Sequence, residues 1–279
     1  MEKKSHEIQL EKYLNHLKQA ERSAATRGQY RRDILCFLSW LNASALTKET
    51  AVAYKQMLEE AYQPVSVNTK LSALNSFFTF LGRSDLHVKL LKIQRRAYCP
   101  VEKELSKAEY LHLVKAAEKR KNEKLALLLQ TICGTGIRVS ELAYITAEAV
   151  RQGEASIRLK GKTRTVLIPR KLQRSLQTYL RRERITAGPV FVTKTGRPLD
   201  RSNIWKMIKG LCREAGVDEK KVFPHNLRHL FARCFYSMDK DIAKLADILG
   251  HSNINTTRIY IITSGREHRR CLDALGLVV

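Results

Sequence analysis

Residues 156–168 read SIRLKGKTRTVLI, and in this stretch apolar and polar side chains alternate on both sides of Gly161. Alternation with a period of two indicates a strand with one buried face, and a glycine between two such runs indicates a turn. We therefore expect a β-hairpin with strands at 156–159 and 165–168, joined through the residues from Lys160 to Thr165. Because the chain on either side has helical periodicity, the predicted fold class is mainly α with a small β-hairpin, α+β.

The first 90 residues carry the pattern of four short helices packed as a bundle. Ser23 and Thr47 are expected to cap the second and third helices, because their side-chain oxygens can accept a free backbone N–H. Pro64 and Ser66 precede the fourth helix, which Gly82 ends. One apolar stripe marks each helix, at Ile8, Leu10, Leu14 and Leu17, then Tyr30, Ile34, Phe37, Leu38 and Leu41, then Val52 and Leu58, then Val67, Leu71, Leu74, Phe78 and Leu81.

Residues 83–103 lack a clear period and are rich in basic side chains. Their position between two periodic regions favours a domain boundary over an ordinary surface loop. We therefore predict a helical domain over 1–85, a basic linker over 86–103 and a second domain over 104–279. A capping box at Ser106 and Glu109 opens the second domain. Its further helices are expected at 125–132, 171–183, 202–215, 226–238 and 241–249.

The chain carries 51 lysines and arginines against 27 aspartates and glutamates, a formal net charge of +24. The excess occurs in both regions, with 16 basic against 9 acidic residues in 1–100 and 35 against 18 in 101–279. Charge spread over two folded domains favours a long polyanion gripped from more than one side. Composition alone also fits a ribosome-associated protein, or a charge that serves only solubility.

The sequence shows no pattern of export, membrane insertion or disulfide bonding. The N-terminus leads into an amphipathic pattern, and no apolar run approaches the roughly 20 residues needed to cross a bilayer. Six cysteines are widely scattered, and several, such as Cys36, lie inside apolar runs, which predicts reduced core residues. We expect a soluble protein of the cytoplasm.

Two segments place cations where a DNA backbone could be bound. Residues 134–142 read GTGIRVSEL: two glycines break a helix, and Arg138 starts the next one, where backbone N–H groups favour an anion. On its own, this segment is more typical of a corner between two helices with a solvated arginine. The hairpin turn carries Lys160, Lys162 and Arg164, a shape that can enter a DNA groove but is also common at soluble tips.

A second set of polar residues lies near the C-terminus. His225 and Arg228 share a helix face, and an imidazole beside a fixed cation suits proton transfer next to a phosphate. His225 and His229 also have the i, i+4 spacing of a metal pair, but no third ligand follows, so we expect no metal. His251 lies at a predicted helix end, and Tyr260 follows nine residues later in an apolar run, where a lone tyrosine is usually a core residue.

Taken together, these segments resemble the tyrosine recombinases, which include phage integrases and Xer-type enzymes, over essentially the whole chain. The resemblance implies a helical core-binding (SAM-like) domain and a mixed α/β catalytic domain that form a C-shaped DNA clamp. Leu230 departs from the threonine common in relatives. The motif positions, in the family's order and spacing, are Arg138 with Glu141 and Leu142, Lys160 with Gly161, His225 with Arg228, His251 after Leu249 and Gly250, and Tyr260.

The resemblance implies a site-specific recombinase that cleaves and rejoins DNA through a 3′-phosphotyrosyl intermediate on Tyr260, without a cofactor. Arg138 and Arg228 would clamp the phosphate. Each remaining residue would have one role: His225 accepts the phenolic proton, His251 hydrogen-bonds a phosphate oxygen, Lys160 protonates the leaving 5′ oxygen and Glu141 orients a neighbouring His or Arg. Lys162 remains an alternative to Lys160.

The family further implies four subunits that act on two DNA duplexes through a Holliday junction. It also implies a location at the nucleoid and possible accessory proteins. The task would be integration or excision of a mobile element, resolution of cointegrates or dimers, or inversion. The tail 271–279 would dock either on its own domain or on a neighbouring subunit. A type IB topoisomerase and a binding-only DNA protein are the rival readings. Candidate DNA contacts are Lys162, Arg164, Arg95, Arg96, Arg31 and Arg32.

Overall fold

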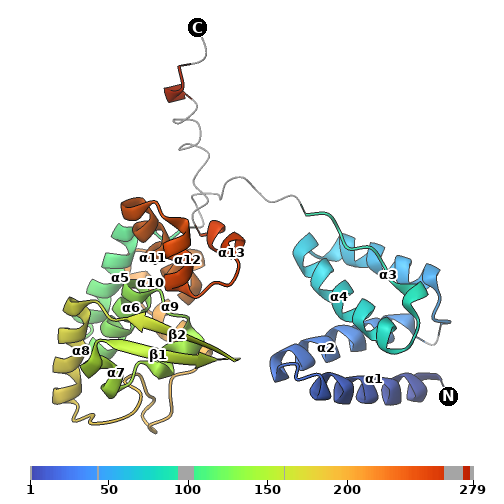
Figure 1. The fold of residues 1–279 in the computed structure, drawn as a ribbon, viewed down its shortest axis with the longest axis horizontal. Coiled ribbons are helices and arrows are strands. Elements are labelled where there is room, and N and C mark those ends of the chain that lie inside the picture. The colour runs from blue at the N-terminus through green and yellow to red at the C-terminus, as the bar shows by residue number, and fades with distance from the viewer. Residues whose placement is uncertain (1, 43, 94–103, 160, 261–272, 277–279) are drawn as a thin grey trace. The chain divides into compact units, whose positions relative to one another are not determined.

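The computed structural model describes residues 2–42, 44–93, 104–159, 161–260 and 273–276, and divides the chain into two compact units, Met1–Arg95 and Arg96–Val279 (Figure 1). The described part is mostly helical and contains one two-stranded antiparallel sheet, so the predicted fold class is confirmed. None of the helices in this part is both long enough and apolar enough to span a bilayer.

Unit 1 is a bundle of helices around an apolar core of its own. Ser23 accepts the backbone N–H of Thr26 and Thr47 accepts that of Thr50, so both predicted N-caps are confirmed. Most residues of the expected apolar stripes lie in this core. The elements of unit 1 are α1 Glu2–Gln19, α2 Ala24–Leu41, α3 Lys48–Ala61, α4 Pro64–Phe80 and η1 Ser84–Leu86.

Unit 1 differs from the sequence prediction in three details. The fourth helix begins at Pro64, earlier than expected, and Ser66 lies inside it. Proline is tolerated at the first helical position because the N–H that it lacks would have no partner within the helix. Ile8 and Val52, both expected in the apolar stripes, are exposed, and α3 buries Ala51 in place of Val52. Cys36 is also exposed, because it lies about 200° around the helix from the buried Ile34, so the prediction that it is a core residue is wrong.

Two asparagines of α4 bind the extended chain that follows the bundle. The side chain of Asn75 donates to the carbonyl of Val88 at 2.9 Å and accepts its N–H at 3.0 Å. Asn68 makes the same pair with Leu91, at 2.9 and 2.8 Å. Each primary amide therefore pairs with the backbone as a neighbouring strand would. These bonds attach residues 86–93, the first part of the expected linker, to the bundle.

Unit 2 opens at the predicted capping box, with Ser106 and Glu109 each bonded to the other's backbone N–H. The helix expected over 202–215 is two helices, because α9 stops at Gly210. The elements of unit 2 are α5 Lys107–Lys119, α6 Glu123–Thr135, η3 Val139–Tyr144, α7 Ala147–Gln152, β1 Glu154–Leu159, β2 Lys162–Leu167, α8 Arg170–Arg182, α9 Arg201–Lys209, α10 Cys212–Ala215, η4 Glu219–Lys221, α11 Pro224–Asp239, α12 Ile242–Leu249 and α13 Ile254–Arg258.

Helix α6 runs through the centre of unit 2 and packs against α5, α8, α9 and α11. Five consecutive residues, 125–129, are buried, as expected for a helix covered on all sides. A small second cluster joins Ala232 of α11, Leu245 and Leu249 of α12, and Tyr260. Tyr260 is therefore held between helices at the edge of the main core.

The predicted β-hairpin is confirmed, but its turn is shorter than expected. Strands β1 and β2 pair from Glu154↔Leu167 to Leu159↔Lys162, which leaves only residues 160 and 161 between the strands. Gly161 has a φ of +71°. Arg164 consequently lies in β2 opposite the buried Ile157 and not on the turn.

We predict that Asn75→Ala destabilises unit 1, because both polar groups of Val88 lose their partner. Leaving such groups unpaired is expected to lower the free energy of unfolding by about 1–3 kcal/mol, measured by urea titration with circular dichroism. Ser66→Ala, at an exposed position of the same helix, is the control, with a change below about 0.5 kcal/mol. Equal stabilities for the two variants would show that Asn75 does not hold the segment.

Candidate active site

Gly136 ends α6 and turns the chain toward Arg138. Its φ is +63°, and a Cβ here would lie 2.5 Å from the ring of Phe231, so glycine is required by both the backbone and the space. Gly134 lies inside α6, so only one of the two glycines breaks the helix. Arg138 then caps η3, a 3₁₀-helix, and so lies at the start of the next helix as the sequence predicts.

The carboxylate of Glu141 holds Arg138 in place. It is buried, with 2% of its side chain exposed, and accepts the backbone N–H of Arg138 at 3.0 Å and its guanidinium at 2.9 Å. Arg164 binds the same carboxylate at 2.5 Å. Burial opposes ionisation of Glu141, but the hydrogen bonds from Arg164 and Arg138 outweigh it and lower the pKa. Glu141 is therefore an anion between two cations.

Arg228, on α11, is almost wholly buried, with 2% exposed. Its guanidinium donates to the carbonyl of Gly136, to that of Leu249 at 2.7 Å, and to Nε2 of His251 at 2.9 Å. Burial and the charge of Arg138 lower the pKa of Arg228 to about 10, so it stays protonated at neutral pH. Its Nε is buried and has no hydrogen-bond partner within the described chain.

Arg138 differs from Arg228 in its access to solvent. Its side chain is 38% exposed, and among the described residues its one polar contact besides Glu141 is a long one, 3.4 Å, to the carbonyl of Gly250. The two arginines thus present one buried and one accessible guanidinium to the same region. Such an arrangement can bind an anion from solvent without moving the buried charge.

The ring of Tyr260 lies among three histidines and one arginine. Its centroid is 5.4 Å from that of His225, 4.2 Å from that of His229 and 5.3 Å from that of His251. The guanidinium carbon of Arg228 is 6.0 Å from the same centroid. Tyr260 itself is 7% exposed. The structure therefore brings the tyrosine, the buried arginine and the imidazoles into one cluster.

The hydrogen bonds of His251 determine which of its ring nitrogens carries the proton. Nε2 lies 2.9 Å from a guanidinium nitrogen of Arg228, which can only donate, so Nε2 accepts. Nδ1 lies 2.9 Å from the hydroxyl of Thr257 and is left as the donor. Thr257 is fully buried. His251 is thus a neutral imidazole with its lone pair directed at Arg228.

All three histidines are neutral at pH 7. Partial burial and the charges of Arg228, Arg201 and Arg138 lower the pKa of His225. Burial, with His225 and Arg228 nearby, lowers the pKa of His229 to about 4, and burial with Arg228 and Arg138 lowers that of His251 to about 4. Neutral imidazoles beside cations can accept protons or hydrogen bonds.

Six residues singled out in the sequence meet in this cluster, although they come from three separated parts of the chain. They are Arg138, Glu141, His225, Arg228, His251 and Tyr260. Lys160, the predicted hairpin lysine, lies outside the described residues. Its neighbour in the turn, Gly161, is described.

The candidate DNA contacts are more dispersed. Arg31 and Arg32 are exposed on α2 of unit 1, and Arg95 and Arg96 lie outside the described residues. The backbone of Lys162 begins β2. Arg164 is only 14% exposed and is bound by Glu141 and the carbonyl of Ile248, so its expected place on an accessible turn is wrong.

Two residues of the cluster were not assigned a role from the sequence. The sequence presents His229 only as half of a possible metal pair, yet among the three histidines its ring lies nearest to that of Tyr260. Its i, i+4 spacing from His225 is the signal that places it near the site. Thr257 gave no signal, because its contact with His251 depends on how α13 folds back on α12.

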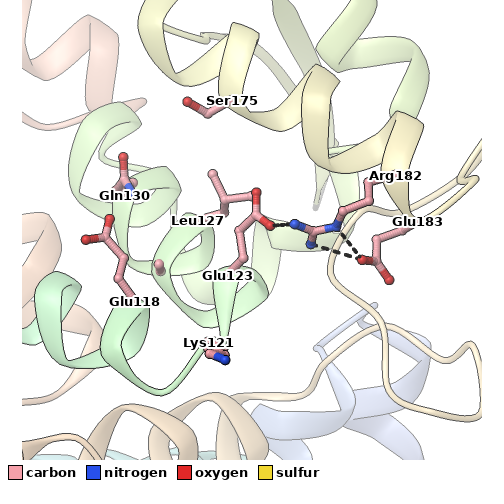
Figure 2. A pocket seen from close by; sticks show the side chains of 9 residues that line it. Glu118, Lys121, Glu123, Leu127, Gln130, Ser175, Arg182 and Glu183 are labelled. Atoms are coloured by element: carbon pink, nitrogen blue, oxygen red, sulfur yellow. Dashed lines mark hydrogen bonds and ion pairs between the residues drawn. The ribbon is translucent and has the colours of Figure 1, made fainter.

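A separate hollow of about 530 Å³ lies between α6, α8 and the end of α5 (Figure 2). Its wall carries Arg182, which pairs with Glu123 and with Glu183 (Figure 2). None of its lining residues belongs to the cluster around Tyr260. Because Arg182 is paired with Glu123 and Glu183 and none of the motif residues lines this hollow, the candidate site is the cluster around Tyr260.

The model of the phage integrase family matches residues 103–265, more than half of the chain, and the model of the phage integrase N-terminal SAM-like domain matches residues 10–85. The chain belongs to the phage integrase family. This membership confirms the resemblance inferred from the motifs.

Named relatives of this integrase-family chain are recombinases. It is 28% identical to the tyrosine recombinase XerA of Pyrococcus furiosus, over 87% of this chain and 93% of the relative. It is 30% identical to the tyrosine recombinase XerD of Xanthomonas campestris, over 95% of this chain and 90% of the relative. The fold matches a crystal structure of the XerH site-specific recombinase with a TM-score of 0.75 and 19% identity, over 94% of this chain and 83% of that one.

This integrase-family chain is accordingly an enzyme, a tyrosine recombinase of the site-specific class. The relatives do not favour the two rival readings, a type IB topoisomerase and a binding-only protein.

We predict that the stability of unit 2 falls as the pH is lowered from about 6.5 toward 4, because of His229 and His251. Both are neutral in the folded protein, with a pKa near 4, and regain an ordinary pKa of about 6.5 when unfolded. The unfolded chain therefore binds more protons in this window, and stability is lost by at most about 1.4 kcal/mol per pH unit for each histidine. Urea titrations at several pH values measure the slope.

His229→Phe keeps an aromatic ring against Tyr260 but cannot titrate, so it should flatten this dependence. His112→Phe, at an exposed position on α5, is the matched control and should keep the slope of the unmodified protein. An unchanged slope in His229→Phe would contradict the depressed pKa of His229.

Proposed function

We propose that Tyr260 is the nucleophile of strand exchange and that Arg138 and Arg228 bind the scissile phosphate. The observation that carries this proposal is the 6.0 Å separation between the guanidinium carbon of Arg228 and the ring of Tyr260. A phosphate bound to Arg228 would lie next to the phenol. Because attack on phosphorus spreads negative charge over the non-bridging oxygens, two guanidinium groups there stabilise the transition state.

His225 accepts the phenolic proton in this mechanism. A neutral tyrosine, with an ordinary pKa of about 10, is a poor nucleophile without a base. His225 is exposed and neutral, and its ring centroid lies 5.4 Å from that of Tyr260. The neutral state that partial burial and the neighbouring cations impose on His225 is the state that a proton acceptor requires.

His251 contacts a phosphate oxygen once DNA is bound. In the free protein its Nε2 accepts from Arg228 and cannot donate. A phosphate placed between Arg138 and Arg228 adds negative charge and raises the pKa of His251. Nε2 then takes up a proton and donates to the phosphate. DNA binding is thereby coupled to the protonation of His251.

The covalent step balances without an external energy source. The phenolic oxygen forms a bond to phosphorus, the bond to the 5′ oxygen breaks, and Lys160 supplies the proton that this oxygen needs. The product is a 3′-phosphotyrosyl intermediate and a free 5′ hydroxyl. Attack by the 5′ hydroxyl of a partner strand releases Tyr260 and reseals the DNA, so no cofactor takes part.

The partner in this proposal is double-stranded DNA that carries recombination sites. In support, structures of the same fold contain DNA: XerH bound to a palindromic difH substrate, a lambda integrase dimer bound to a COC′ core site, and the Tn1549 transposon integrase with transposon right end DNA. Four subunits would act through a Holliday junction on a mobile element or its products, with accessory proteins where direction is imposed.

Both units contribute to DNA binding in this proposal. We assign residues 1–85 to the core-binding domain, 86–103 to the linker and 104–279 to the catalytic domain. The net charge of +24 supports contact with a long polyanion. The proposed backbone contacts are Arg31 and Arg32 in the first domain, Arg95 and Arg96 in the linker, and Lys162 in the hairpin.

We predict that Tyr260→Phe binds DNA as the unmodified protein does but forms no covalent adduct, because it lacks the attacking oxygen. The substrate is a nicked DNA duplex, made from a genomic fragment of the source organism that is selected by its affinity for the protein. Covalent adducts are quantified on denaturing gels. Tyr236→Phe, a partly buried tyrosine of α11, is the control and should form the adduct. An adduct in Tyr260→Phe would overturn the assignment.

We predict that affinity for DNA falls steeply with salt and that Arg31→Gln with Arg32→Gln reduces the log–log slope by about 2, one for each lost phosphate contact. The slope is measured by titrations from about 50 to about 200 mM salt. Over this range a protein with several phosphate contacts loses affinity by orders of magnitude. Arg120→Gln with Arg182→Gln is the control, because both side chains are hydrogen-bonded to glutamates, whereas Arg31 has a longer ion pair, 3.7 Å, with Glu11. Equal slopes for the two double variants would count against contacts through α2.

A further inference from the structure

We propose that Arg164 is a positioning residue that links the β-hairpin to Arg138 through Glu141. This inference rests on the proposed function, in which Arg138 binds the scissile phosphate. It assigns Arg164 a role within the protein in place of the DNA contact expected from its position after Lys160 and Gly161.

Arg164 joins three elements of unit 2 through its guanidinium group. One nitrogen donates to the carboxylate of Glu141 on η3 at 2.5 Å, and another donates to the carbonyl of Ile248 on α12 at 2.8 Å. The side chain itself belongs to β2. Only 14% of it is exposed, and only 2% of Glu141, so the pair is shielded from solvent. An ion pair that is shielded from solvent and supported by further hydrogen bonds is held in a single geometry. An exposed ion pair is not held in this way.

Arg138 depends on the same carboxylate. Glu141 binds both the backbone N–H and the guanidinium of Arg138, and within the part of the chain that the structure describes the guanidinium has one further contact, at 3.4 Å to Gly250. The orientation of Arg138 therefore follows that of Glu141. Arg164 binds Oε2 of Glu141, the oxygen that also accepts the backbone N–H of Arg138, so it helps to fix how Glu141 is turned.

The end of α12 is shaped around Arg164. A Cβ on Gly250 would lie 2.3 Å from Cδ of Arg164, so the absence of a side chain there makes room for the arginine. Gly250 precedes His251, whose pKa is lowered in part by the charge of Arg164. Arg164 thus packs against the segments that carry both Arg138 and His251.

The hairpin register explains why Arg164 can transmit a movement. Arg164 lies three residues after the turn glycine, Gly161, and opposite Ile157, which is 1% exposed. A displacement of β2 when the turn meets DNA moves Arg164, and with it the carboxylate of Glu141. Contact between the hairpin and DNA is in this way coupled to the orientation of Arg138.

The test compares Arg164→Met, which removes both bonds at similar length, with Arg164→Lys, which keeps a charge and one donor. Single-turnover adduct formation on the nicked genomic duplex gives the cleavage rate, and titration gives the DNA affinity. We expect Arg164→Met to cleave about 100-fold more slowly, the scale of a misplaced catalytic group, with unchanged affinity. Arg164→Lys should recover part of the rate. Arg174→Met, exposed on α8, should cleave as the unmodified protein does.

Two further readouts separate positioning from mere stabilisation. If Arg164 acts through Glu141, adding Glu141→Gln to Arg164→Met should slow cleavage by no more than about 2-fold beyond the slower single variant, whereas independent effects would multiply. Loss of Arg164 also removes a bond that lowers the pKa of Glu141. The cleavage rate of Arg164→Met should therefore fall as the pH drops toward the ordinary carboxyl range, at pH values where the unmodified rate is still level.

Cleavage by Arg164→Met at the unmodified rate would overturn the inference. Effects that multiply with those of Glu141→Gln, or a rate loss matched by a loss of melting temperature and not recovered by lysine, would overturn it as well. These outcomes leave Tyr260 as the nucleophile. By contrast, an adduct formed by Tyr260→Phe would refute the proposed function itself, whatever the rate of the Arg164 variants.

Discussion

The buried guanidinium of Arg228 is the constraint on which the geometry of the cluster depends. A charge can be held away from water only where hydrogen bonds replace its hydration. The carbonyls that do this come from Gly136 and Leu249, at the C-terminal ends of α6 and α12, where helix carbonyls are unpaired and carry partial negative charge. One cation on α11 therefore fixes the ends of two other helices, and Arg138 and His251 follow directly after those ends.

The cluster concentrates positive charge that has few anions to balance it. Burial and the charge of Arg138 lower the pKa of Arg228, and burial together with both arginines lowers the pKa values of His225 and His251. Glu141 is bound on both sides by arginines and neutralises only part of this charge. Like charges held together in a poorly solvated site raise the free energy of the empty state. A phosphate that enters relieves this repulsion, so the folded protein is electrostatically prepared for a DNA backbone.

Local chemistry was predictable from the sequence, and distant contacts were not. The caps at Ser23 and Thr47 depend on residues three positions away, so the sequence predicts them correctly. The bonds from Asn75 to Val88 and from Thr257 to His251 depend on how separate segments fold together. Arg164 lies between these cases. Its spacing of two from the buried Val166 placed it on the inner face of β2, and only an overestimate of the turn length suggested an accessible position.

The motif residues were recognised through a family resemblance, but the fold gives a physical reason for the interval between His251 and Tyr260. Helix α13 lies between them, and its Thr257 contacts both: the hydroxyl binds Nδ1 of His251, and the carbonyl accepts the backbone N–H of Tyr260. A single buried residue therefore binds the histidine, whose tautomer Arg228 determines, and also holds the backbone of the tyrosine. An inserted residue on either side of Thr257 would rotate one partner by about 100° on the helix. The interval between His251 and Tyr260 follows from one short helix that binds the side chain of the first and the backbone of the second.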